Sequence, residues 1–297
     1  TRCTPWLGFD LGTETMIERI AVIGAGTMGH GIAHVAAASG FDVALYDIEQ
    51  SFVDRGLANI TANLDKGIEK GKVTADQKAA TLARIHATFD LNAAAADAQL
   101  VIEAIPEKLA LKQDLYAKLE DICRSDAIFA SNTSSLSIAK LASVTQRPGR
   151  FIGMHFFNPV HIMKLLEIVV ADGTSEATLA AVKAVGEKLG KDCIVVKDFP
   201  GFATSRLGVC LGLEAIRMVE QGVASAEDID KAMTLGYAHP MGPLRLTDLV
   251  GLDVRLNIAD YLHTELRSEV FSAPKLMRDM VAKGKLGKKS GQGFYTW

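Results

Sequence analysis

Short runs of apolar, β-branched residues alternate with longer amphipathic segments over the first two thirds of the chain. The apolar runs predict strands at residues 19–23, 42–46, 99–104, 126–131, 151–156, 165–170 and 193–196. The segments between them repeat apolar residues every three to four positions and predict helices at residues 29–39, 51–71, 75–84, 107–123 and 175–189. This alternation predicts an α/β fold with a mainly parallel sheet covered by helices on both faces.

The pattern changes after the segment KDFPGF at residues 197–202. Beyond it the apolar positions follow a helical period throughout. Ser225 and Asp228 resemble a capping box at a helix start, with Asp in place of the usual Glu. We therefore predict a Rossmann-type domain over residues 16–200 and an all-helical domain over residues 201–297.

Composition narrows the class of protein. Of the 297 residues, 48% are hydrophobic and 23% are charged, which is typical of a globular chain. The net charge of −3 argues against nucleic-acid binding, and no apolar run is long enough to span a membrane. Scattered cysteines indicate free thiols, and residues 1–15 lack a secretory signal, so we expect a cytoplasmic protein. We interpret residues 1–15 as a leader or added extension before a natural start at Met16.

The most specific local motif is GAGTMG at residues 24–29, placed between a predicted strand and a predicted helix. Its first glycine permits a tight turn, the second lets the backbone approach a pyrophosphate, and the third lets the helix pack on the strand. Asp47 ends the next strand, where a carboxylate accepts hydrogen bonds from ribose hydroxyls and repels a 2′-phosphate. The pattern predicts NAD, held by Gly24, Gly26, Thr27, Met28, Gly29 and Asp47.

His30 and His34 follow this motif at the spacing of two zinc ligands on one helix face. No third ligand is evident in the sequence. We therefore interpret both histidines as packing or surface residues and expect no metal site.

Four further motifs indicate a family: SNTSSLSI at 131–138, HFFNPV at 155–160, PGF at 200–202 and GYAHPMGPLRLTDLVGLD at 236–253. Together they resemble those of the L-3-hydroxyacyl-CoA dehydrogenases, most of all the bacterial 3-hydroxybutyryl-CoA dehydrogenases. The likeness covers essentially the whole chain from Met16. It implies NAD-dependent oxidation of a (S)-3-hydroxyacyl-CoA, expected to be short-chain, to the 3-ketoacyl-CoA, and the reverse reaction.

The resemblance implies roles for particular residues. His155 matches the family's general base, and Glu167 matches the carboxylate that orients its ring. Each alone would more simply be a core histidine or an outward-facing strand residue, but the pair at this spacing favours catalysis. Ser134 matches a serine that binds the substrate, although a serine before a helix is also a natural N-cap. Ser205 stands where the family has asparagine, which shortens the reach and removes a donor.

Further matches extend the implied cofactor site. Asn158 matches an asparagine that contacts the cofactor, and Asn132 and Ser134 lie in the SNTSS motif of the same site. Glu107 and Lys112 match contacts near the nicotinamide-side ribose. On the sequence alone, both of these charges would be solvated residues of a helix.

The predicted helix 51–71 corresponds to the family's CoA-binding arm, with Asn63 and Lys70 as implied CoA contacts and solvated surface as the alternative. Gly208 and Gly212 lie one helical turn apart in the second domain, where the family dimerises, so we expect a homodimer. A dehydrogenase of a free hydroxy acid, of the gulonate or carnitine type, is the alternative function on the same fold. A non-enzymatic NAD-binding protein is the third, disfavoured by the paired histidine and glutamate.

Overall fold

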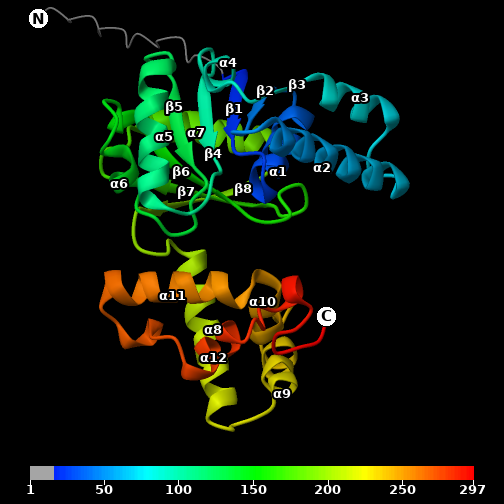
Figure 1. Cartoon of the computed structure of the whole chain (residues 1–297), viewed down its shortest axis with the longest axis vertical. Coiled ribbons are helices and arrows are strands. Elements are labelled where there is room, and N and C mark those ends of the chain that lie inside the picture. Colours follow the sequence, from blue (N-terminus) through cyan, green and yellow to red (C-terminus); the bar gives the residue numbers. More distant parts are fainter. Residues whose placement is uncertain (1–16) are drawn as a thin grey trace, which may run out of the picture.

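A computed structural model describes residues 17–297, so the predicted leader at 1–15 lies outside the described residues. The chain forms an α/β domain followed by a helical domain, with one long helix leading from the first into the second (Figure 1). The predicted fold class is confirmed.

The first domain is built on an eight-stranded sheet with the order β3–β2–β1–β4–β5–β6–β7–β8. Neighbouring strands are parallel except β6 and β7, which are antiparallel. The strands are β1 (Arg19–Ile23), β2 (Asp42–Tyr46), β3 (Ile85–Thr88), β4 (Leu100–Glu103), β5 (Ile128–Ser131), β6 (Phe151–Phe156), β7 (Leu165–Val170) and β8 (Asp192–Lys197). The strand order reverses between β1 and β4, and such a reversal opens a ligand crevice at the carboxyl ends of the strands.

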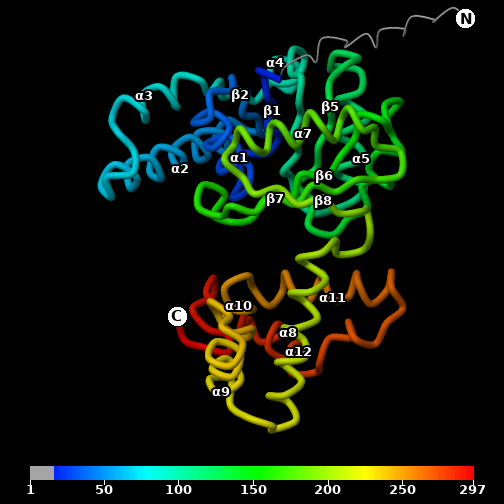
Figure 2. Tube along the Cα trace, turned by 180° about the vertical axis from the view of Figure 1, so that it is seen from behind, coloured from blue at the N-terminus to red at the C-terminus, as the bar shows by residue number. Residues whose placement is uncertain are grey.

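Helices cover both faces because the strand residues alternate between two apolar clusters, with Ile20 and Val22 in one and Ala21 and Ile23 in the other. The first face is covered by α1 (Thr27–Ala38), α2 (Gln50–Glu69), α3 (Ala75–Ala83) and α7 (Glu176–Lys188). The second is covered by α4 (Leu91–Ala95), α5 (Leu109–Ile122) and α6 (Ile138–Ala142). Helices α2 and α3 project from the domain as a hairpin, and α7 crosses the face of the sheet (Figure 2).

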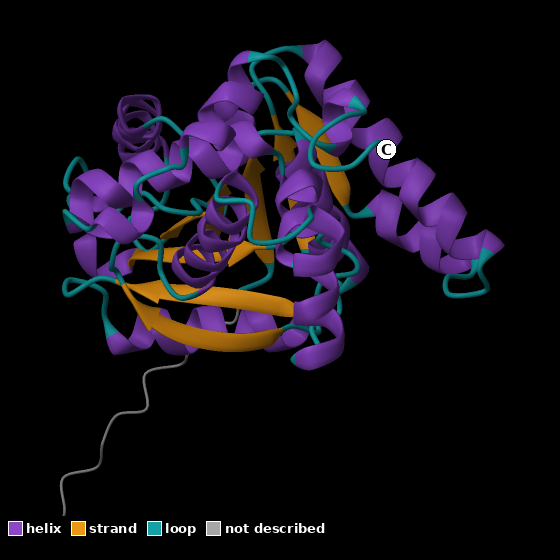
Figure 3. Cartoon of the chain, turned by 90° about the horizontal axis from the view of Figure 1, so that it is seen from below, coloured by secondary structure: helices purple, strands orange, loops and turns teal. Residues whose placement is uncertain are grey.

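The second domain consists of α8 (Thr204–Glu220), α9 (Ala226–Lys231), α10 (Pro243–Val250), α11 (Leu252–Leu266) and α12 (Lys275–Ala282), around a core that includes Leu213, Ile216 and Leu262. Figure 3 shows its helices lying across the end of the sheet. The glycines expected to admit another helix serve the domain's own packing. A Cβ on Gly212 would lie 2.7 Å from Nη1 of Arg255, a residue of α11.

Most predicted elements are confirmed, with ends that shift by no more than two residues. Three further elements, β3, α4 and α6, were not predicted from the sequence, and each is five residues or shorter. The predicted capping box is half formed: the Ser225 hydroxyl accepts from the Asp228 N–H, but the Asp228 carboxylate accepts from that hydroxyl instead of the backbone. The N-cap serine of α6 is Ser137, so Ser134 does not cap that helix.

Candidate active site

The glycine loop after β1 has the shape that a dinucleotide requires. Gly24 has φ of 105°, and a Cβ there would lie 2.8 Å from the carbonyl oxygen of Ala104. A Cβ on Gly29 would lie 1.6 Å from the Gly24 oxygen, so only glycine lets α1 start this close to the strand. Gly26 is the N-cap of α1 and faces open space, which leaves the helix N-terminus free to bind an anion.

Asp47 follows β2 and lies against this loop. Its Oδ2 accepts from the N–H of Ala25 at 2.7 Å, and its Oδ1 accepts from Ile48 N–H at 2.8 Å. Thr27 is exposed and Met28 is half-buried at the first turn of α1. The structure therefore brings together all six residues that the motif predicts as the NAD site.

The antiparallel pairing of β6 and β7 sets His155 directly opposite Glu167. The imidazole Nδ1 lies 2.9 Å from Glu167 Oε2, and both side chains are buried. Apolar neighbours surround the ring, with the Phe157 centroid 4.5 Å and the Phe202 centroid 6.1 Å away. Phe202 has φ of 51°, in the left-handed region that a large side chain rarely adopts.

Glu167 also holds the start of α8. Its Oε1 accepts from the backbone N–H groups of Ala203 and Thr204 at 2.9 and 3.1 Å, and its Oε2 accepts from the Thr204 hydroxyl at 2.8 Å. Burial opposes ionisation of this carboxyl, but the hydrogen bonds from His155, Thr204 and Ala203 outweigh it and lower its pKa. Glu167 is therefore ionised at neutral pH, and Thr204 is a site residue that the sequence analysis missed.

Glu107 and Lys112 form a network with a second missed residue, Glu103. Lys112 Nζ lies 2.6 Å from Glu103 Oε1 and 3.1 Å from Glu107 Oε2. Only 1% of the Lys112 side chain is exposed, so the alternative of a solvated helix charge is wrong for this lysine. Glu107 Oε1 accepts from the Ser134 N–H at 3.0 Å, which brings Ser134 into the same network.

The other predicted site residues lie around the carboxyl ends of the strands. Asn132 Oδ1 accepts from the Phe156 N–H at 2.9 Å and so joins the loop after β5 to the end of β6. Asn158 is exposed in the turn after β6 and precedes a cis proline bond. Ser205 is half-buried in the first turn of α8, and its hydroxyl has no hydrogen-bond partner within residues 17–297.

The implied CoA contacts lie on the α2–α3 hairpin. Asn63 is half-buried in α2, and Lys70 is exposed at its C-cap. The ring of His161, in the loop after Pro159, stacks on His34 of α1 with 5.5 Å between centroids. Burial and the nearby charges of His30, Lys191, Lys66 and Lys70 lower the His161 pKa, so this loop lies in the positive field of the hairpin.

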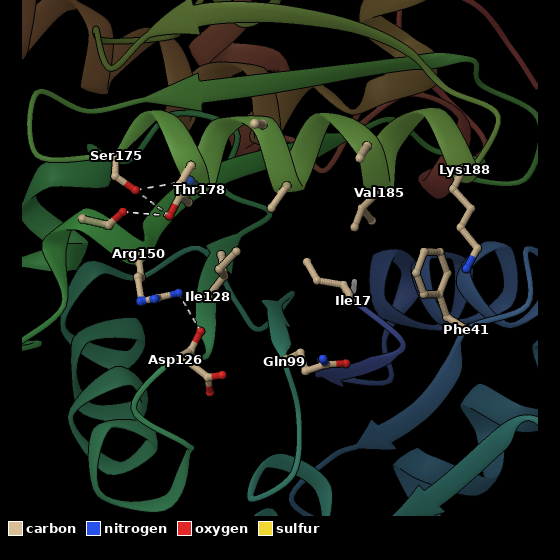
Figure 4. Close-up of a pocket in the computed structure, with 15 residues that line it drawn as sticks. Ile17, Phe41, Gln99, Asp126, Ile128, Arg150, Ser175, Thr178, Val185 and Lys188 are labelled. Atoms are coloured by element: carbon tan, nitrogen blue, oxygen red, sulfur yellow. Dashed lines mark hydrogen bonds between the residues drawn. The ribbon is translucent and has the colours of Figure 1, made fainter. Parts of the chain in front are cut away.

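A cavity of about 800 Å³ lies elsewhere (Figure 4). Gln99, Ile128 and Arg150 line it, and each lies at the amino end of a strand, whereas His155 lies toward a carboxyl end. The cavity therefore does not belong to the candidate site. Among residues 17–297 no three His, Cys, Asp or Glu side chains are grouped to hold a metal ion, and no helix is long and apolar enough to cross a membrane.

Known proteins match the chain over most of its length. Residues 19–199 match the family model "3-hydroxyacyl-CoA dehydrogenase, NAD binding domain", and residues 201–297 match "3-hydroxyacyl-CoA dehydrogenase, C-terminal domain". A probable 3-hydroxybutyryl-CoA dehydrogenase of Deinococcus radiodurans is 48% identical over 94% of this chain and 100% of that protein. The crystal structure of FadB2 from M. tuberculosis superposes with a TM-score of 0.93 at 43% identity, covering 95% of this chain and 99% of that one. That of (S)-3-hydroxybutyryl-CoA dehydrogenase PaaH1 from Ralstonia eutropha gives 0.91 at 44% identity, with the same coverage.

Proposed function

The chain belongs to the 3-hydroxyacyl-CoA dehydrogenase family and is an NAD-dependent oxidoreductase, and from this premise we propose that it interconverts a short-chain (S)-3-hydroxyacyl-CoA and its 3-ketoacyl-CoA, with His155 and Glu167 as the catalytic pair. The observation that carries the proposal is the buried contact between Nδ1 of His155 and Oε2 of Glu167. The short acyl chain is supported by relatives named for 3-hydroxybutyryl-CoA.

The pair works through the tautomer that the carboxylate selects. Because ionised Glu167 can only accept, Nδ1 of His155 carries a hydrogen and Nε2 keeps a free lone pair. Nε2 then takes the proton of the substrate's 3-hydroxyl and returns it in the reverse direction. Glu167 stabilises the resulting imidazolium, and the surrounding Phe157 and Phe202 exclude water and strengthen that attraction.

The nucleotide site fits NAD. Gly26 and the uncapped N-terminus of α1 would hold the pyrophosphate, and the acidic Asp47 would disfavour a 2′-phosphate on the ribose. NAD, when bound, accepts the hydride from C3 of the substrate. Glu107, Lys112, Asn132 and Asn158 complete the cofactor side of the site.

Residues of both domains form the substrate side of the proposed site. Ser134 and Ser205 bind the hydroxyl or thioester oxygen, and the single Ser205 hydroxyl offers one donor where an amide would offer two. Lys70, with Asn63 on the same hairpin, faces the nucleotide end of CoA, because a cation favours phosphate. The acyl-CoA thus lies with its acyl end toward His155.

Steady-state assays with acetoacetyl-CoA and longer 3-ketoacyl-CoAs test the substrate, with NADH compared to NADPH. We expect the highest kcat/KM with acetoacetyl-CoA and NADH. A higher kcat/KM for a free 3-hydroxy acid than for its CoA thioester would replace the proposal with the free-acid alternative. Tight NAD binding without turnover of any of these substrates would make it a non-enzymatic NAD-binding protein.

A homodimer and a cytoplasmic location complete the proposal. The helical domain exposes large apolar side chains, including Leu207, Leu235 and Tyr237, with 71%, 82% and 76% exposed. Exposed apolar side chains of this size are typical of an interface, and a second copy of the helical domain is the partner proposed here. Light scattering is expected to give twice the chain mass of 31.8 kDa, and Leu235→Glu is expected to shift it toward the monomer. A monomeric mass for the unaltered protein would refute the dimer.

A further inference from the structure

A buried carboxylate that the proposed reaction does not use lies beneath the cofactor site. Glu103 is the last residue of β4 and is 0% exposed. Its Oε1 accepts from Lys112 Nζ at 2.6 Å and from the Ile105 N–H at 2.8 Å, and its Oε2 accepts from the Ser131 hydroxyl at 2.7 Å. Glu103 is therefore tied to the loop after β4, to β5 and to α5 at once.

Lys112 carries this connection outward to the site. Its ammonium group lies between Glu103 and Glu107, and the Glu107 side chain is 39% exposed. The second oxygen of Glu107 accepts from the Thr133 hydroxyl and from the Ser134 N–H. A continuous series of charge-assisted contacts thus runs from Glu103 through Lys112 and Glu107 to the backbone of Ser134.

Stability alone gives little reason to keep charges in this place. Moving an ion pair out of water costs about as much as the pair regains, and apolar replacements of similar volume are often as stable. Burial raises the Glu103 pKa, and the neighbouring Lys112 opposes that rise. The network instead fixes the orientation of its side chains. Each carboxylate oxygen of Glu103 and Glu107 accepts from a specific donor, and the Lys112 ammonium group lies between the two carboxylates.

We propose that Glu103 is a positioning residue of the cofactor site: by fixing Lys112 it fixes Glu107, and with Glu107 the backbone of Ser134 at the carboxyl ends of β4 and β5. The inference rests on the proposed function, because it takes Glu107 as a cofactor contact and Ser134 as a residue of the same site. In this proposal Glu103 contacts neither the substrate nor the cofactor and acts only through Lys112 and Glu107.

The first test is Glu103→Gln, which keeps the side-chain shape and removes the charge that holds Lys112. The released ammonium group draws Glu107 away from Ser134, so the KM for NADH is expected to rise about tenfold, a usual size for coupling within one ionic network. The KM for acetoacetyl-CoA is expected to stay within about twofold, because the network reaches only the backbone N–H of Ser134 and not the side-chain hydroxyl proposed to bind the substrate.

The matched control is Glu120→Gln. Glu120 lies on α5, the helix that carries Lys112, and it pairs with a basic side chain of the first domain, Arg147, whose Nε lies 3.0 Å from Glu120 Oε2. Within residues 17–297 it makes no hydrogen bond or ion pair with Glu103, Lys112 or Glu107. We expect this variant to lower Tm while leaving both KM values unchanged. A role for Glu103 in stability alone would give the same result as this control.

A double-mutant cycle separates positioning from independent effects. If Glu103 acts through Glu107, then Glu103→Gln combined with Glu107→Gln raises the KM for NADH no further than Glu107→Gln alone. The comparison cycle pairs Glu103→Gln with Asp47→Asn at the adenosine end of the site, where the two effects are expected to multiply. Multiplying effects in the Glu107 cycle would overturn the proposal, as would an unchanged KM for NADH in Glu103→Gln.

Should Glu103→Gln fail to fold, Ser131→Ala carries the test. It removes one donor from Glu103 and leaves the charges, so we expect about a threefold rise in the KM for NADH, the loss of a single hydrogen bond; no rise would overturn the proposal. Turnover of acyl-CoA by the unaltered enzyme distinguishes failure of the proposed function from failure of this inference. If it turns over no acyl-CoA, the reaction assigned above is wrong, and fluorescence titration with NADH still measures the coupling of Glu103 to Glu107.

Discussion

Replacing Glu167 by glutamine tests the catalytic pair directly. The carboxylate accepts four hydrogen bonds, from His155 Nδ1, the Thr204 hydroxyl and the backbone N–H groups of Ala203 and Thr204. Glutamine has one acceptor oxygen and one NH₂ group, so it cannot satisfy all four donors in either orientation. The orientation of the glutamine amide determines which ring nitrogen of His155 carries the hydrogen.

The two backbone donors cannot become acceptors, whereas the hydroxyl and the imidazole can. Turning the NH₂ group toward Ala203 and Thr204 would leave two buried N–H groups unpaired, at about 1–3 kcal/mol each. The amide oxygen therefore faces the backbone, and the NH₂ group faces His155 Nδ1. The imidazole must then hold its hydrogen on Nε2, the atom that should take the substrate proton.

We expect Glu167→Gln to lower kcat by about 10²–10⁴, the range for loss of a general base or of its orienting acid. The KM for NADH is expected to change by no more than about twofold, because the substitution touches no part of the glycine loop. Stopped-flow and steady-state measurements of NADH oxidation with acetoacetyl-CoA measure both, and far-UV circular dichroism checks that the variant is folded. An unchanged kcat in a folded variant would refute the pairing.

Thr204→Val is the graded companion, since it removes one of the four donors and leaves the imidazole tautomer unchanged; we expect kcat to fall about three- to tenfold in the same assay. Burial lowers the His34 pKa from 6.5 to about 4. As the pH falls, the unfolded chain therefore takes up a proton at this histidine before the folded chain does. About 3 kcal/mol of folding free energy that is present above pH 6.5 is lost as the pH falls toward 4. Urea unfolding at both pH values should show that His34→Gln removes this loss; an equal loss in the variant would assign it elsewhere. Asp248→Ala leaves the donors of the C-terminal segment, including Trp297 Nε1, without an acceptor, so calorimetry should show a loss of about 3 kcal/mol. Lys70→Met should raise the KM for acetoacetyl-CoA about fivefold but not that for an acetoacetyl pantetheine thioester, which lacks the phosphate of the nucleotide; equal effects on both would remove Lys70 from the CoA site.

The parts of the site that the sequence predicts well are those with local steric causes. Gly24 and Gly29 are needed because any Cβ would collide with the neighbouring backbone, and this requirement is visible within six residues of sequence. His155 and Glu167 are close because two strands that follow each other in the sequence pair as antiparallel neighbours. The strand β3 was not predicted from the sequence. It has four residues, two of them polar, and so short a run shows no clear alternation of apolar and polar positions.

The contacts that the sequence could not predict join residues distant along the chain. Glu167 and Thr204 are 37 positions apart and lie in different domains, so no local pattern relates them. The burial of Lys112 is a different case, since a signal was present. Lys112, Tyr116 and Leu119 follow the helical spacing of one face, and the last two are fully buried. A lysine on the buried face of an amphipathic helix requires a carboxylate, and Glu103 at the end of an apolar strand supplies it.

Glu167 joins His155 to the geometry of the second domain. Its two oxygens hold the histidine on one side and the first backbone N–H groups of α8 on the other, so the carboxylate also caps the helix that enters the helical domain. Ser205 is the next residue after Thr204 in that helix turn. The hydrogen bonds that orient His155 therefore also fix the position of Ser205, and a shift of α8 would move the Ser205 hydroxyl and weaken the contact between Glu167 and His155 together. Ser205→Asn would lengthen the reach of that side chain without disturbing the cap, because the donors that Glu167 accepts from α8 belong to Ala203 and Thr204.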